Sequence, residues 1–270
     1  MFKRQTSGST VCRACARLVG VNDDTCFNCG AKNPALWGYA PILRRLGYNL
    51  GFVPIVIYGC VSLYLLTLLY DPGGIRMGGL FSLFAPSVES LYVFGASGAY
   101  PVFVEGRWWT ILSAAWLHGG FLHILFNLMW IRHMAPATAE MYGASRLVII
   151  YTASSAAGFF LSSIGGNLLT IGASAPIFGL FAALIWAGRR TGNTALGQQS
   201  FIFAAVLFRF GFAMPGIDNL AHLGGFIGGF ATCIWLDPLK EETFVDLVLA
   251  LLCVVLIAAS LLASVALALL

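Results

Sequence analysis

The chain has 270 residues, of which 59% are hydrophobic and 10% are charged, and its net charge is +4. A soluble globular domain carries roughly 25% charged residues, so this composition excludes an ordinary water-soluble core and favours a lipid bilayer as the solvent. The mild net charge gives no reason to expect a nucleic-acid partner. Because the first ten residues are polar, no cleaved export signal is expected there.

The N-terminal segment carries two Cys-x-x-Cys pairs, Cys12 with Cys15 and Cys26 with Cys29. Each pair can present two thiolates from one tight turn, and Gly30 supplies a residue that tolerates a positive φ angle. Together the pairs can complete a tetrahedral zinc site, with redox-active cysteines as the main alternative. We therefore predict a small zinc-ribbon domain over residues 1–33, which binds a structural Zn²⁺ and can dock to a cytoplasmic partner, followed by a linker over 34–48.

Seven apolar stretches of near bilayer-spanning length, about 20 residues each, follow the linker. They cover residues 49–70, 108–133, 147–164, 171–188, 200–214, 219–236 and 244–270. The long connection 71–107 mixes apolar pieces with glycine and proline, which is typical of a segment in the membrane interface. We predict an all-α membrane protein with a compact six-helix bundle over 49–243 and an additional C-terminal helix over 244–270.

The distribution of lysine and arginine predicts the orientation. If the N-terminus is cytoplasmic, twelve basic residues lie on the inner side: Lys3, Arg4, Arg13, Arg17, Lys32, Arg44, Arg45, Arg132, Arg146, Arg189, Arg190 and Lys240. Only Arg76 and Arg107 lie outside, and Arg209 lies within a span. Such an excess is typical of cytoplasmic loops. We therefore expect a multi-pass protein of the cell inner or plasma membrane with a cytoplasmic N-terminus.

A few polar side chains interrupt the predicted spans. They are His118, His123 and Asn127 in the second span, Ser174 at the start of the fourth, and Asn219 and His222 at the start of the sixth. Ionisable groups in membrane helices are costly and commonly functional. Because these three spans run from outside to inside, we expect the side chains to converge in the outer half of one bundle.

This set contains the groups that acyl transfer requires. A serine hydroxyl needs a base to remove its proton, which His222 can provide for Ser174. The oxyanion needs donors, which His123, Asn127 and the backbone N–H of Ser174 can provide. Asp218 lies only at the membrane surface, so a Ser–His dyad is predicted rather than a triad. A lone serine in a membrane helix is more often a packing residue, so the prediction rests on the combination.

Three motifs follow one another along the chain. They are His123-Ile-Leu-Phe-Asn127 in the second span, Gly172-Ala-Ser174 in the fourth and His222-Leu-Gly-Gly225 in the sixth. Over about residues 50–236 the chain thereby resembles the rhomboid family of intramembrane serine proteases, and the seventh span resembles its six-plus-one arrangement. The resemblance implies that Ser174 attacks the peptide bond and His222 is the general base.

By the same resemblance, His123 and Asn127 bind the oxyanion, Phe178 stacks near His222, and His118 shapes the outer end of the second span. The substrates would be single-pass membrane proteins, cut within or beside their membrane helix at a site opening to the outer side. No metal or other cofactor would be needed for the chemistry. A catalytically inactive relative that binds membrane clients is the alternative.

Two departures from the family pattern stand out. Ala175 follows the serine where the family usually has glycine, so its methyl group can crowd the oxyanion site. Thr110 follows Trp109 where the family favours arginine, and Arg107 lies nearby as a substitute. Gly95-Ala-Ser97-Gly98 matches a Gly-x-Ser-Gly string more literally than Ser174 does, but it lies in the long connection. We favour Ser174, because oxyanion donors are available at a helix start.

Overall fold

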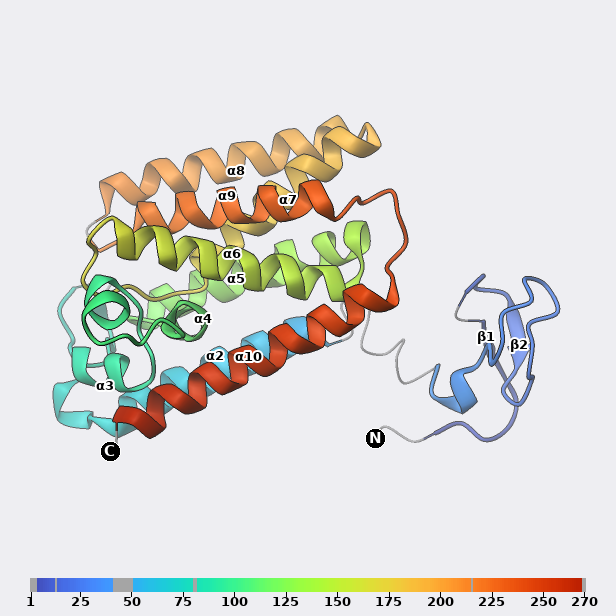
Figure 1. Cartoon of the computed structure of the whole chain (residues 1–270), viewed down its shortest axis with the longest axis horizontal. Coiled ribbons are helices and arrows are strands. Elements are labelled where there is room, and N and C mark those ends of the chain that lie inside the picture. Colours follow the sequence, from blue (N-terminus) through green and yellow to red (C-terminus); the bar gives the residue numbers. More distant parts are fainter. Residues whose placement is uncertain (1–3, 13, 41–50, 80–81, 215, 269–270) are drawn as a thin grey trace. The chain divides into compact units, whose positions relative to one another are not determined.

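The structure, a computed structural model, describes residues 4–12, 14–40, 51–79, 82–214 and 216–268. It is 67% helical, and it divides into two compact units, Met1–Gly51 and Phe52–Leu270 (Figure 1). The predicted all-α membrane fold with a small N-terminal ribbon is confirmed in outline. Parts of the predicted linker and of the first predicted span fall on residues 41–50, outside the described residues.

The N-terminal unit is built from two short turns. Strands β1 (Ser9–Val11) and β2 (Leu18–Gly20) pair antiparallel, and they enclose the first Cys-x-x-Cys pair. An isolated bridge between Thr25 and Lys32 encloses the second pair in the same way. A single 3-10 turn, η1 (Leu36–Gly38), follows. Both cysteine pairs therefore lie at the tips of hairpin-like loops.

The second unit is helical. Its elements are α2 (Phe52–Tyr70), η2 (Pro72–Gly74), α3 (Val88–Val93), η4 (Tyr100–Val104), α4 (Thr110–Ser113), η5 (Ala114–Trp116), α5 (Phe121–Tyr142), α6 (Ala144–Ile164), α7 (Ser174–Thr191), α8 (Thr194–Ala213), α9 (Asn219–Trp235) and α10 (Phe244–Ala268). The long helices α2 and α5 to α10 correspond to the seven predicted apolar stretches. In its described residues, 71–79 and 82–107, the connection contains only short helices.

Several of these helices can cross a membrane. In the described part of the chain, α2, α6, α8 and α10 are long and apolar enough, and α4–η5 with α5 adds a fifth span if the bent pair is counted as one. Helix α9 is shorter, with 17 residues, and the last turn of α7 carries the charged residues Arg189 and Arg190. Thirteen of the 18 residues of α7 are buried, so neighbouring helices cover it. The apolar helices identify an integral membrane protein.

The second predicted span, 108–133, is wrong as a single helix. The chain bends by 96° between α4–η5 and α5, at the pair Gly119-Gly120. Glycine is a poor helix former, and α5 begins only at Phe121 and continues to Tyr142. His118 therefore precedes the helix, and Arg132 lies in its middle rather than at its inner end.

Glycines allow α9 to contact α7 through the backbone. A Cβ atom on Gly229 would lie 2.5 Å from Gly179 Cα, and one on Gly225 would lie 2.1 Å from the carbonyl oxygen of Ala175. No side chain tolerates such distances. Gly225 and Gly229, which have Gly-x-x-x-Gly spacing, therefore form a backbone contact with α7, and Ser174 and His222 near the starts of the two helices meet.

A valine at this contact should destabilise the bundle. We expect Gly229→Val to lower the free energy of unfolding by roughly 2 kcal/mol, because overpacking against backbone cannot be relieved by a rotamer change. Gly78→Val is the control, since a Cβ there meets nothing within 4 Å. Thermal unfolding in detergent micelles measures both, and equal melting temperatures for the two variants would contradict the packing account.

Candidate active site

Ser174 is the first residue of α7, and the backbone before it is held in an unusual conformation. Gly172 has φ of 118°, which favours glycine, and its N–H donates to the carbonyl oxygen of Ala114 at 2.9 Å. A Cβ on Gly172 would lie 2.7 Å from Nε2 of His123. Glycine thus both turns the chain into α7 and leaves room for the imidazole.

His222 lies one turn into α9 and faces the serine. Its Nε2 is 2.9 Å from the Ser174 Oγ atom, which is a hydrogen-bond distance. The ring of Phe178 stacks on the imidazole with centroids 4.3 Å apart and planes 17° apart. The imidazole is buried. Asp218 caps α9 by accepting the N–H of Ala221 at 2.9 Å, which fixes the start of the helix that carries His222.

Asn219 contacts the other ring nitrogen of His222. Its Oδ1 lies 3.3 Å from Nδ1 of His222. A carbonyl oxygen only accepts, so Nδ1 carries the proton and Nε2 presents a lone pair to the hydroxyl of Ser174. On α8, a Cβ on Gly211 would lie 2.1 Å from the same Oδ1 atom. Gly211 therefore makes the space in which Asn219 is held.

A second imidazole lies on the other side of Gly172. Nδ1 of His123 accepts the backbone N–H of Gly119 at 3.2 Å, so its Nε2 carries a proton and can donate. Asn127 donates one N–H to the carbonyl oxygen of His123 at 2.8 Å. His118 is fully buried, and its ring meets that of His123 edge-on with centroids 5.2 Å apart. It lies in the turn before α5, not in the helix as predicted.

The structure thus brings Ser174 and His222 together with four of the six predicted supporting residues, which are Gly172, His123, Phe178 and Asn219. Asn127 lies one helical turn further along α5 and is joined to this group through the carbonyl oxygen of His123. His118 contacts this group through the ring of His123. Ser97 faces Thr110 instead: it is fully buried, its Oγ lies 3.3 Å from Oγ1 of Thr110, and its backbone pairs with Thr170. The arrangement places one imidazole beside the hydroxyl of Ser174 and a second imidazole beside Gly172.

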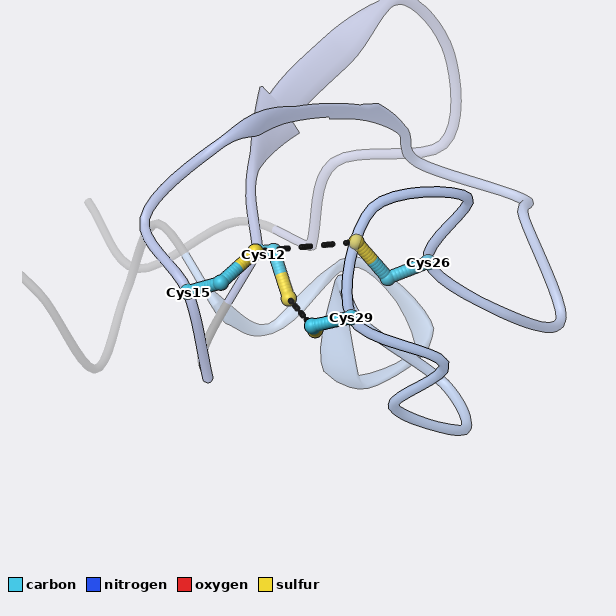
Figure 2. A group of neighbouring side chains, drawn as sticks. All are labelled: Cys12, Cys15, Cys26 and Cys29. Carbon is cyan, nitrogen blue, oxygen red and sulfur yellow. Dashed lines mark hydrogen bonds between the residues drawn. The ribbon is translucent and has the colours of Figure 1, made fainter.

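The four N-terminal cysteines form a separate cluster (Figure 2). Their Sγ atoms all lie within 4.8 Å of one another, and the closest pairs are 3.7 and 3.8 Å apart. A disulfide needs about 2.05 Å, whereas ligands 2.3 Å from a zinc ion at tetrahedral angles lie about 3.8 Å apart. The four thiols therefore fit a metal ion and not a disulfide.

Ionisation of the thiols also suits a cation. A hydrogen bond from the backbone N–H of Arg17 lowers the pKa of Cys15 to about 6. The pKa of Cys29 is raised to about 12, because contacts with the neighbouring cysteine side chains, Cys15 first, outweigh a hydrogen bond from the backbone of Ala31. Four adjacent thiols do not all ionise unless a positive ion lies between them.

Comparison with known proteins identifies the helical unit. A family model described as the rhomboid domain matches residues 105–238. The putative rhomboid protease YdcA of Bacillus subtilis (strain 168) is 34% identical over 146 residues, which cover 52% of this chain and 73% of that protein. The chain belongs to the rhomboid family.

Other relatives extend the comparison. Rhomboid protease GluP of Bacillus subtilis (strain 168) is 32% identical over 161 residues, 58% of this chain and 32% of that protein. RHOMBOID-like protein 5 of Arabidopsis thaliana is 34% identical over 158 residues, 55% of this chain and 50% of that protein. The chain thus spans about a third to a half of the length of these two rhomboid relatives.

The structure accommodates the two departures from the rhomboid pattern, Ala175 and Thr110. A Cβ on Gly158 of α6 would lie 2.7 Å from the Cβ of Ala175, so the extra methyl group packs into the space left by this glycine. Arg107 is buried and stacks over the ring of Tyr92 at 4.4 Å, and Thr110 donates to the carbonyl oxygen of Arg107 at 2.8 Å.

Sequence reasoning missed the residues that contact His123 and Asn219 and hold them in place. The N–H of Gly119 sets the proton position on His123, and Gly211 makes space for Asn219. The pair Gly119-Gly120 inside an apolar run was a signal for the bend. Gly211 and Gly158 carry no comparable signal, because a single glycine in a membrane helix is common.

Replacing Gly172 should lower the free energy of unfolding by more than backbone strain alone would. We expect Gly166→Ala, at φ of 85° with nothing within 4 Å of its Cβ, to cost roughly 1–3 kcal/mol. Gly172→Ala should cost clearly more, because its methyl group also meets His123. Chemical or thermal unfolding of both variants measures the difference. If Gly172→Ala is the milder of the two, His123 does not occupy this position.

Proposed function

We propose that the protein is an intramembrane serine endopeptidase in which Ser174 is the nucleophile and His222 the general base. The observation that carries the proposal is the 2.9 Å contact between His222 Nε2 and Ser174 Oγ, with Nδ1 held by Asn219. With the lone pair on Nε2, the imidazole takes the hydroxyl proton as Oγ attacks the carbonyl carbon of the substrate. It then returns the proton to the leaving amine.

The oxyanion that forms in this attack needs donors on the other face of Ser174. Nε2–H of His123 is a candidate, because its Nδ1 is occupied by Gly119 and its Nε2 faces Gly172. The first N–H groups of α7 have no partner within the helix, and they add a partial positive charge. Asn127 supplies its second amide N–H from one turn deeper. A water molecule, activated by His222, hydrolyses the acyl-enzyme.

We propose single-pass membrane proteins as the substrates, cut within or beside their membrane helix. The positions of Ser174 and His222 near the starts of α7 and α9 support an active site sunk slightly below one membrane surface. The excess of basic residues on the opposite side supports a cytoplasmic N-terminus, an outward-facing site and a location in the cell inner or plasma membrane.

Substitution of either member of the dyad should abolish cleavage. We expect Ser174→Ala and His222→Ala to lower kcat for a model transmembrane substrate in proteoliposomes by about 10⁴-fold or more. Ser97→Ala should retain activity, since Ser97 lies outside the site. Cleavage that survives Ser174→Ala would refute the assignment. A wild-type protein that binds such a substrate without cutting it would favour the inactive, client-binding alternative.

We also propose that the cysteine cluster binds one structural Zn²⁺ through Cys12, Cys15, Cys26 and Cys29. The spacing of their Sγ atoms supports this ion, as do the two similar turns, in which Ala16 and Gly30 have φ of 57° and 72°. Zinc here orders a unit with a very small apolar core and plays no part in peptide hydrolysis. A ribbon of this kind suits docking to a cytoplasmic partner.

Zinc content should follow the cluster alone. We expect about one zinc ion per chain after purification without chelator, and a loss of most of it in Cys26→Ser. Cys253→Ser, on α10, should bind as much zinc as the wild type. Elemental analysis of the purified proteins measures both. Four free thiols in the wild type, together with no bound zinc, would contradict the proposal.

A further inference from the structure

Helix α10 follows residues 105–238, the part of the chain that the rhomboid family model matches. It packs along α6 and against α4. Most of its side chains are exposed, and its buried face consists of Asp246, Ala250, Ile257, Ser260 and Ser264. Three of these five are polar, which is costly in a membrane helix unless each has a partner. Their partners therefore indicate what α10 does.

The last third of α10 contacts the segment that leads into α4. Ser260 Oγ donates to the carbonyl oxygen of Trp109 at 2.7 Å, and the indole N–H of Trp109 donates to Ser264 Oγ at 3.2 Å. The guanidinium of Arg107 donates to the carbonyl oxygen of Ser264 at 3.2 Å. A Cβ on Gly95 would lie 2.5 Å from Ser264 Oγ, so no larger residue fits there. Ser260, Ser264 and Arg107 are all at most 6% exposed.

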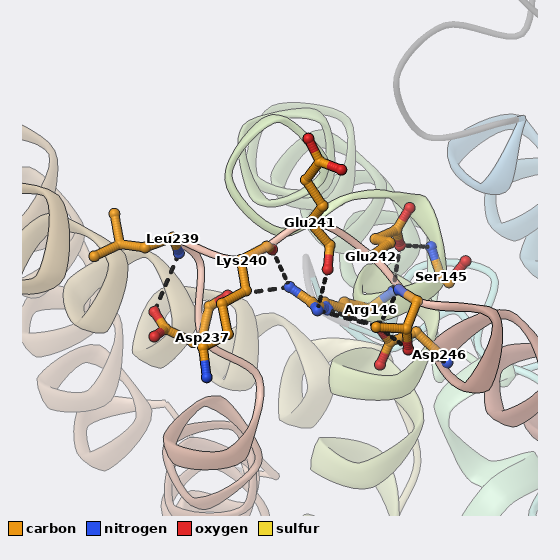
Figure 3. Close-up of polar contacts among 9 residues, drawn as sticks. Ser145, Arg146, Asp237, Leu239, Lys240, Glu241, Glu242 and Asp246 are labelled. Carbon is orange, nitrogen blue, oxygen red and sulfur yellow. Dashed lines mark hydrogen bonds and ion pairs between the residues drawn. The ribbon is translucent and has the colours of Figure 1, made fainter. Parts of the chain in front are cut away.

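The first turn of α10 is fixed just as firmly to the start of α6 (Figure 3). Arg146, 4% exposed, forms an ion pair with Asp246 at 3.1 Å. Its guanidinium also donates to three carbonyl oxygens in the connection from α9, those of Asp237, Lys240 and Glu241. The Glu242 carboxylate accepts the N–H groups of Ser145 and Arg146, which caps α6. With both ends attached, α10 cannot slide along the bundle.

A short series of contacts connects α10 with the serine. Trp109 directly precedes α4, and α4 runs into Ala114, whose carbonyl oxygen accepts the N–H of Gly172 at 2.9 Å. Gly172 is two residues from Ser174. In addition, Ser113 Oγ donates to the carbonyl oxygen of Gly95 at 2.8 Å. Gly95 therefore contacts both Ser264 of α10 and Ser113 of α4.

We propose that α10 is a positioning element for the nucleophile. Through Ser260 and Ser264 it fixes Trp109 and α4, and Ala114 in turn fixes Gly172 and so the place of the Ser174 hydroxyl. The expected effect on catalysis rests on the proposed protease activity. The series of contacts from α10 to Gly172 does not depend on that activity. Because the contacts act on the position of the Ser174 hydroxyl, we expect their loss to affect the chemical step rather than substrate binding.

The test removes the polar contacts and leaves the helix in place. The variants are the double substitution Ser260→Ala with Ser264→Ala, and Trp109→Phe, which keeps the aromatic ring but loses the indole N–H. Ser163→Ala is the control, since the hydroxyl of this buried serine of α6 donates to its own helix, at the carbonyl oxygen of Phe159, and the substitution leaves the backbone contacts of residue 163 in place. Amide hydrogen exchange of residues 166–174 and the kcat and KM for a model transmembrane substrate are measured in proteoliposomes.

Both test variants should exchange faster at residues 166–174, and their kcat should fall on the order of tenfold with KM unchanged, because small displacements of a nucleophile are costly. Ser163→Ala should match the wild type in all three. Unchanged exchange in both test variants would overturn the inference, as would an equal loss of kcat in the control. If the wild type does not cleave but exchange changes as expected, the protease assignment fails and the coupling stands.

Discussion

The approach of α9 to α7 is the constraint on which the site depends. Serine and imidazole come from positions 48 residues apart, and they meet only because Gly225 and Gly229 let the two backbones touch near Ala175 and Gly179. Any side chain at these glycines would force the helices apart, because a Cβ there would lie only 2.1 to 2.5 Å from backbone atoms of α7. In a bilayer, where apolar surface gives no net attraction between helices, such close van der Waals contact is the main source of association.

Once the helices are in contact, the polar groups inside the bundle must each find a partner, and the partners determine the chemistry. Asn219 and Gly119 act on two different imidazoles and place their protons on opposite sides. His222 is left with a lone pair toward Ser174, and His123 is left with a proton toward the same region. One histidine is thereby prepared to accept a proton and the other to donate a hydrogen bond, although the residue type is the same.

The sequence was sufficient to predict the fold class and to single out Ser174, His222 and His123, because helix length, basic loops and the spacing of polar side chains each follow simple rules. Helix ends were less predictable. Apolarity alone did not reveal that Gly119-Gly120 ends one segment and that α5 continues to Tyr142. Contacts between distant segments, such as Ser264 with Trp109 or Gly158 with Ala175, depend on tertiary packing, and no local pattern encodes them.

The most direct test of the central claim is covalent labelling of the nucleophile, which needs no substrate. Wild-type protein in liposomes is treated with a fluorophosphonate, and peptide mapping by mass spectrometry locates the adduct. The account predicts one adduct, on Ser174, and its loss in His222→Ala and in Gly229→Val, where the base is absent or moved away. An adduct on Ser97 instead, or equal labelling of Ser174 after His222→Ala, would contradict it.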